Sequence, residues 1–150
     1  MTPVEELRYL ILAAQREGNR QLAQALRPLG ITPAQAEVLR LLEDRQPLTL
    51  SGLGELLVCE SGTNPSRLVD RLVSAGLVDR VPGAQDRRQV ELTLTPTGKR
   101  LARKVAGLED ELHRLLQSAG SAREIATVVG FLRTLVDGQP AGEALALRRD

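Results

Sequence analysis

Single polar residues separate Val90, Leu92 and Leu94, so apolar and polar positions alternate along this part of the chain. A period of two is typical of a β-strand with one buried face. A second short apolar run, residues 77–81, precedes it, and turn-forming residues lie between the two. We therefore predict a β-hairpin over residues 77–95 with a charged tip.

Elsewhere the apolar spacing is helical, and three helix starts carry capping residues. Thr32 and Ser121 each stand three residues before a Gln or Glu, the pattern of a capping box, and Thr95 is followed by a proline. The predicted helices span Pro3–Leu29, Pro33–Asp44, a segment from a cap at Ser51 to Val58, Ser61–Gly76, Pro96–Gln117 and Ala122–Val136. Residues 48–50 form a short strand, and residues 138–150 form a loosely ordered or partly helical tail.

Pro65 complicates the start of the fourth helix. With Ser61 as the cap, Pro65 could not donate a backbone hydrogen bond to the Ser61 carbonyl, and its ring would crowd that carbonyl. A start at Asn64, with Pro65 as the first helical residue, removes the conflict.

The fifth and sixth helices each carry a narrow apolar seam with spacings of three and four residues. Packing within one subunit is one explanation. The other is a dimer interface, because long helices outside a compact core have little in the monomer to cover them. For this interface we predict Leu101, Val105, Leu108, Leu112, Ile125 and Leu132.

Composition supports a mainly helical fold. Hydrophobic residues make up 42% of the chain and aromatic residues only 1%, so the core depends on Leu, Val and Ala. There is no apolar run of about 18 residues and no signal-peptide pattern, so we expect a cytoplasmic protein without a membrane partner.

Candidate chemistry is sparse. The only cysteine, Cys59, and the only histidine, His113, fall on separate predicted elements. Neither a nucleophilic constellation nor a histidine-rich metal cluster can be assembled from them. We expect neither an enzyme nor a bound cofactor.

Charge is unevenly distributed although the net charge is only +1. Residues 61–104 carry nine basic side chains against four acidic ones. A basic excess over a helix and a hairpin is the electrostatic pattern of a nucleic-acid-binding surface.

Together these elements describe a winged helix-turn-helix, mostly α with a small β wing. The third and fourth helices form the helix-turn-helix and the hairpin forms the wing. We assign residues 31–95 to DNA binding and residues 1–30 and 96–137 to a helical dimerisation region.

Four segments carry a specific pattern, and they are Ser66–Leu72, Gly76–Val78, Asp86–Arg88 and Leu92–Gly98. These segments and the order of the elements resemble the MarR family of bacterial transcription regulators. The resemblance covers roughly residues 5 to 137. It implies a homodimer that binds a pseudo-palindromic operator in double-stranded DNA and usually represses transcription. It also implies release by a small anionic or phenolic effector in the cleft between the dimer helices and the DNA-binding lobe.

The resemblance gives the DNA-contacting residues. Arg88 corresponds to a wing arginine that enters the minor groove, Asp86 holds it extended, and Arg87 contacts phosphate. The recognition helix presents Ser61, Thr63, Asn64, Ser66 and Arg67.

Two alternatives remain open. A winged-helix module could bind protein and not DNA, although it would have no use for the basic wing tip. Some family members respond to cysteine oxidation, which would require a lowered pKa for Cys59, whereas the neighbouring Glu60 raises it.

Overall fold

The computed structural model describes residues 1–59 and 64–150. Its elements are α1 (Pro3–Leu26), a 3₁₀ turn η1 (Arg27–Leu29), α2 (Pro33–Arg45), β1 (Leu48–Thr49), α3 (Leu50–Leu56), α4 (Pro65–Ser74), β2 (Val78–Pro82), β3 (Val90–Leu94), α5 (Pro96–Ser118), α6 (Ala122–Val136) and α7 (Pro140–Arg149). The predicted fold class, mostly helical with a small β wing, is confirmed.

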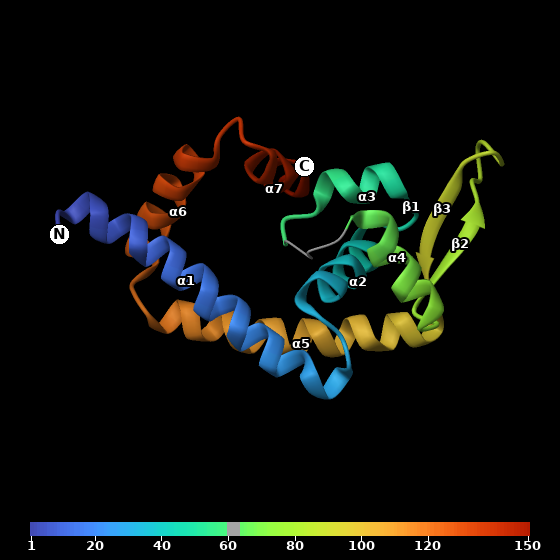
Figure 1. Ribbon diagram of the computed structural model, residues 1–150, viewed down its shortest axis with the longest axis horizontal. Coiled ribbons are helices and arrows are strands. Elements are labelled where there is room, and N and C mark those ends of the chain that lie inside the picture. The colour runs from blue at the N-terminus through green and yellow to red at the C-terminus, as the bar shows by residue number, and fades with distance from the viewer. Residues whose placement is uncertain (60–63) are drawn as a thin grey trace.

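The helices divide the molecule into two ends joined by α1 and α5, which contact each other (Figure 1). Helices α2, α3 and α4 gather at one end, where the β2–β3 hairpin projects beyond them. Helix α6 lies at the other end, and α7 returns from it to contact α3. The helix-turn-helix and the hairpin therefore lie together at one end of the molecule.

Local capping sets most helix starts. The capping boxes at Thr32 and Ser121 are both formed, and the Thr95 side chain accepts a hydrogen bond from the Gly98 amide. One prediction is wrong: the cap of α3 is Thr49, not Ser51, and the helix ends at Leu56. Both candidates are hydroxyl residues, but Thr49 is the last residue of β1 and has the extended backbone that a cap requires.

The sheet has three antiparallel strands in the order β1-β3-β2. Val78 pairs with Leu94 at the base of the hairpin, and Pro82 pairs with Val90 near its tip. Leu92 and Leu94 are buried, whereas Val90 is 52% exposed. The alternation predicted from sequence thus buries only the part of β3 that lies over the helices.

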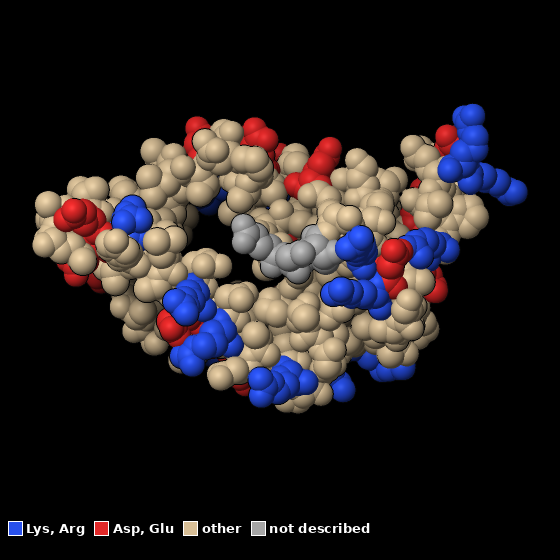
Figure 2. Space-filling view, in the orientation of Figure 1, with Lys and Arg blue, Asp and Glu red and all other residues tan. Residues whose placement is uncertain are grey.

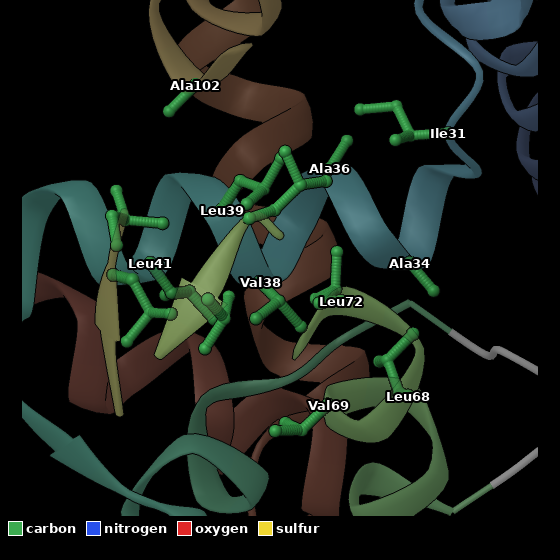
Figure 3. Close-up of a cluster of buried hydrophobic side chains, with 14 of the residues drawn as sticks. Ile31, Ala34, Ala36, Val38, Leu39, Leu41, Leu68, Val69, Leu72 and Ala102 are labelled. Atoms are coloured by element: carbon green, nitrogen blue, oxygen red, sulfur yellow. The ribbon is translucent and has the colours of Figure 1, made fainter. Parts of the chain in front are cut away.

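The core lies between α2, the sheet and the helices around them (Figure 3). Its fully buried large side chains are Leu26, Val38, Leu39, Leu42, Leu53, Val69, Leu72, Val78, Leu92 and Val105. Each such side chain contributes roughly 1.5 to 3 kcal/mol by leaving water. Helix α4 and the base of the wing therefore pack into the same hydrophobic core.

Three residues predicted for dimerisation belong to this core. Val105 is 0% exposed within the single chain, and Leu101 and Leu108 pack against the buried cluster. The prediction is wrong for Val105, because this side chain is buried in the core of the single chain and has no surface for a second subunit. Of the others, Leu112 and Ile125 are half-buried and Leu132 is 38% exposed.

The C-terminal segment is helical over most of its length. Helix α7 covers Pro140–Arg149, and its Ala144 is 2% exposed. We expected a loosely ordered or partly helical tail, and the assignment as loosely ordered is wrong, because residues 140–149 form a regular helix. The segment is ordered by contacts with α3 and α6, and α3 lies far from it in sequence.

None of the helices among the described residues is long and apolar enough to span a membrane.

Candidate nucleic-acid interface

Helix α4 spans Pro65–Ser74, so the predicted span Ser61–Gly76 is too long and the later start that avoids the proline conflict is the one observed. Asn64 is the N-cap, its side-chain oxygen accepting a hydrogen bond from the Arg67 amide at 2.9 Å, and Pro65 is the first helical residue. Leu68 and Leu72 are buried, as predicted. Polar and basic side chains therefore face outward from this helix.

Of the predicted recognition residues, Asn64, Ser66 and Arg67 are exposed. The other two, Ser61 and Thr63, lie outside the described residues. Sequence reasoning missed Arg71, which is also exposed on α4, one helical turn beyond Arg67.

The tip of the hairpin is a closed turn. The Gly83 amide donates to the Gln89 carbonyl at 2.8 Å, and the Gln89 amide donates to the Asp86 carbonyl at 3.1 Å. These bonds fix the backbone that carries Arg87 and Arg88.

Asp86 orients Arg88 at this tip. One carboxylate oxygen of Asp86 accepts from the Arg88 backbone amide at 3.0 Å and from its Nε at 3.2 Å. The Arg88 side chain is nevertheless 92% exposed. Figure 2 shows this basic tip standing clear of the rest of the molecule. Asp86 thus makes the predicted contact with Arg88, and the Arg88 guanidinium points into solvent.

The base of the hairpin is tied to α4. Arg80 on β2 forms an ion pair with Asp70 on α4. The Thr95 hydroxyl donates to the Gly76 carbonyl at 2.6 Å, and the Thr95 amide donates to the Leu77 carbonyl at 3.1 Å. The recognition helix and the wing are thus fastened to each other directly and not only through the core.

Cys59 does not have the chemistry of a redox sensor. Burial, together with a hydrogen bond to Glu37, raises the pKa of its thiol to about 12. A reactive cysteine needs a lowered pKa, since the thiolate is the nucleophile. His113 is exposed on a different element, α5.

A charged cleft of about 600 Å³ is lined by residues of α1, α2, α5 and α7. Its lining combines Arg40, Arg45 and Arg148 with Glu37, Asp44 and Glu109, and Cys59 lies at its wall. Arg40 bonds Glu109 through Nε at 2.9 Å, and it also pairs with Glu43. The family resemblance implied an effector cleft, but sequence reasoning could not give its lining, because these residues come from α1, α2, α5 and α7.

Known proteins share this arrangement. Residues 31–90 match the model of the MarR family. Over 128 residues the chain is 32% identical to the multiple antibiotic resistance protein MarR of Escherichia coli K12, covering 85% of this chain and 88% of that protein. The chain belongs to the MarR family.

Two solved MarR-family structures with DNA share its fold. A cysteine-to-serine mutant of E. coli MarR in complex with operator DNA has a TM-score of 0.76 at 31% identity, covering 89% of this chain and 95% of that chain. The S. aureus MepR–DNA complex has a TM-score of 0.77 at 27% identity, covering 85% of this chain and 94% of that chain.

Membership of the MarR family establishes the general function. The chain is a DNA-binding transcription regulator and not an enzyme. An interaction module without DNA binding is thereby set aside.

Proposed function

We propose that the chain is a homodimeric repressor that reads a pseudo-palindromic operator with α4 in the major groove and Arg88 in the minor groove. The observation that carries this proposal is the pairing of Asp86 with an almost fully exposed Arg88, on a hairpin tied to α4. A narrow minor groove concentrates negative potential and attracts an inserted arginine. A protein reading the chromosome in this way acts in the cytoplasm.

A salt-series anisotropy titration tests DNA reading. The full chain is titrated onto a duplex from its own promoter region and onto a scrambled duplex of equal length. Operator binding predicts selective affinity with a steep salt slope, because each neutralised phosphate releases counterions. Equal affinity for the two duplexes at every salt concentration, repeated with duplexes from neighbouring promoters, contradicts the proposal.

Exposed apolar residues at the other end of the molecule support the homodimer. A groove of about 600 Å³ between α1 and α6 is lined by Leu7, Leu10, Ile11, Val128, Phe131 and Leu132, among others. Phe131 is 45% exposed and Val128 is 55% exposed. A contiguous apolar surface of this kind marks an association site, and the sites of homodimers are usually two-fold symmetric.

Mass measurement by light scattering tests the homodimer. We expect twice the chain mass for the wild type and a monomer for Phe131→Asp, because a charge in the apolar groove cannot be desolvated on association. Val90→Asp is the matched control, since Val90 is as exposed but lies on the wing. A wild-type monomer at micromolar concentration contradicts this part of the proposal.

The effector is best accommodated in the charged cleft. The cleft lies between α2 of the DNA-binding end and the helices α1, α5 and α7. Its three arginines suit a small carboxylate or phenolate, although its own acidic residues partly neutralise them. Arg40 is held by Glu43 and Glu109, and Arg148 is held by Glu37. Arg45 donates to the Arg148 carbonyl at 2.6 Å and forms no ion pair with another described residue, so it is the cation most available to a ligand.

Salicylate, a phenolic carboxylate, is a suitable first probe of the cleft. We expect it to raise the thermal unfolding midpoint and to release the promoter duplex, and Arg45→Ala to weaken both effects. Benzylamine, which has a similar ring and the opposite charge, is the control. Release by benzylamine and not by salicylate would assign the cleft to cations.

A further inference from the structure

Arg148, near the C-terminus, contacts the DNA-binding end of the molecule. Its Nε and one terminal nitrogen donate to the Leu56 carbonyl at 2.9 and 2.6 Å. The same terminal nitrogen lies 3.1 Å from a carboxylate oxygen of Glu37. Leu56 is the last residue of α3, where helix carbonyls lack partners and a cation is favoured.

Glu37 carries this contact to the turn of the helix-turn-helix. Its carboxylate accepts hydrogen bonds from the Val58 amide at 2.7 Å and from the Cys59 amide at 3.1 Å. The Glu37 side chain is only 9% exposed. A buried carboxylate is costly without a cation, so Arg148 stabilises the group that fixes the backbone of residues 58 and 59.

The opposite end of α7 is fitted closely to α6. A β-carbon at Gly142 would lie 1.9 Å from the Val136 carbonyl oxygen and 2.7 Å from its carbon. Only glycine allows the first turn of α7 to approach the last residue of α6 so closely. Helix α7 therefore has one end packed on α6 and the other hydrogen-bonded to α3.

We propose that α7 is a clamp that sets the position of the recognition helix relative to α6, and that Arg148 is its positioning residue. Arg148 touches no DNA in this role. It acts through the Leu56 carbonyl and Glu37, which hold the end of α3 and residues 58 and 59, and α3 packs against α4. The clamp adds to operator affinity by reducing the number of orientations that α4 samples before binding.

Two substitutions in the full chain disturb the clamp by different routes. Arg148→Ala removes the bonds to Leu56 and Glu37. Gly142→Ala forces α7 away from α6 without altering any charge. The matched controls are Arg149→Ala, which removes an equal charge from an exposed neighbour, and Gly107→Ala, where a β-carbon meets nothing within 4 Å.

The first readout is DNA binding. Both clamp variants should bind the promoter duplex about tenfold more weakly than the wild type, and both controls should stay within about twofold. The slope of affinity against salt should not change, because no phosphate contact is lost. A slope reduced by about one for Arg148→Ala would make Arg148 a phosphate contact and overturn the proposal.

The second readout is hydrogen exchange of the Val58 and Cys59 amides, which requires no DNA. We expect exchange at least about tenfold faster in both clamp variants, with core amides such as that of Leu42 unchanged. The comparison with core amides distinguishes local opening at residues 58 and 59 from unfolding of the whole domain.

Unchanged exchange at residues 58 and 59 in both clamp variants would overturn the proposal, as would equal operator affinity for Arg148→Ala and Arg149→Ala. If the wild type binds no promoter duplex, the DNA-reading proposal fails, and the exchange experiment still decides whether the clamp exists.

Discussion

Gly98 and Leu77 are in such close contact that a β-carbon on Gly98 would lie 2.0 Å from the Leu77 carbonyl oxygen. Gly98 is in the first turn of α5, and Leu77 directly precedes β2. The Leu77 carbonyl also accepts a hydrogen bond from the Thr95 amide. The start of α5 and the base of the wing are therefore built as one unit that has no room for a side chain at residue 98.

Gly98→Ala should lower the free energy of unfolding by roughly 1 to 3 kcal/mol, because the obstructing atoms are backbone and cannot rotate away. Urea unfolding followed by circular dichroism measures this. The Gly107→Ala variant should instead be neutral or up to about 1 kcal/mol more stable, since alanine favours a helix interior. Equal stability of the two variants would contradict the close contact.

Arg88→Ala should weaken binding to the promoter duplex by roughly 1 to 3 kcal/mol, or about 5- to 150-fold in Kd, because the minor-groove contact is lost. The dimer, measured by light scattering, should be unaffected. Retained affinity would remove Arg88 from the interface.

Asp86→Ala distinguishes orientation from charge. Removing an acidic residue beside DNA should strengthen binding if net charge alone matters. If Asp86 acts by directing Arg88, the same substitution should weaken binding, by less than the loss of Arg88 itself. Anisotropy titration at one fixed salt concentration shows whether Asp86→Ala binds the promoter duplex more strongly or more weakly than the wild type.

Asn64 allows stability and DNA binding to be separated. Asn64→Asp keeps an oxygen acceptor for the Arg67 amide, so the free energy of unfolding should change by less than about 0.5 kcal/mol, whereas Asn64→Ala should lose about 1 kcal/mol. The aspartate adds a negative charge facing phosphate, so it should bind the promoter duplex more weakly than the alanine variant. The reverse order of affinities would place residue 64 away from the DNA.

The raised pKa of Cys59 predicts a loss of stability in alkaline solution. Because the folded pKa, about 12, exceeds the usual value of about 8.5, the stabilisation is complete below that usual value and is lost as the pH rises toward 12. The urea midpoint of the wild type should fall more steeply between about pH 8 and about pH 11 than that of Cys59→Ala. Parallel pH profiles would contradict the burial of the thiol.

Local features were predictable from the sequence because their causes are local. Thr32, Thr95 and Ser121 cap helices whose first turns follow within three residues. The start of α4 at Pro65 followed from the geometry of proline alone. The alternation of Leu92 and Leu94 likewise indicated the buried face of β3.

Long-range contacts were not predictable in this way. The seam containing Val105 has the same spacing whether it packs against α2 or a second subunit, so periodicity could not decide between them. Arg148 lies 92 positions from Leu56, and nothing near it in sequence indicates that partner. The residues that line the charged cleft were not predictable for the same reason.

Because the base of the wing is attached to the start of α5, a change in the direction of α5 moves the wing. Helix α5 has 23 residues and is therefore about 34 Å long. A tilt of about 5° at its far end displaces the wing by about 3 Å, close to the rise of one base pair. The placement of the wing therefore depends on the orientation of α5 along the whole length of the helix.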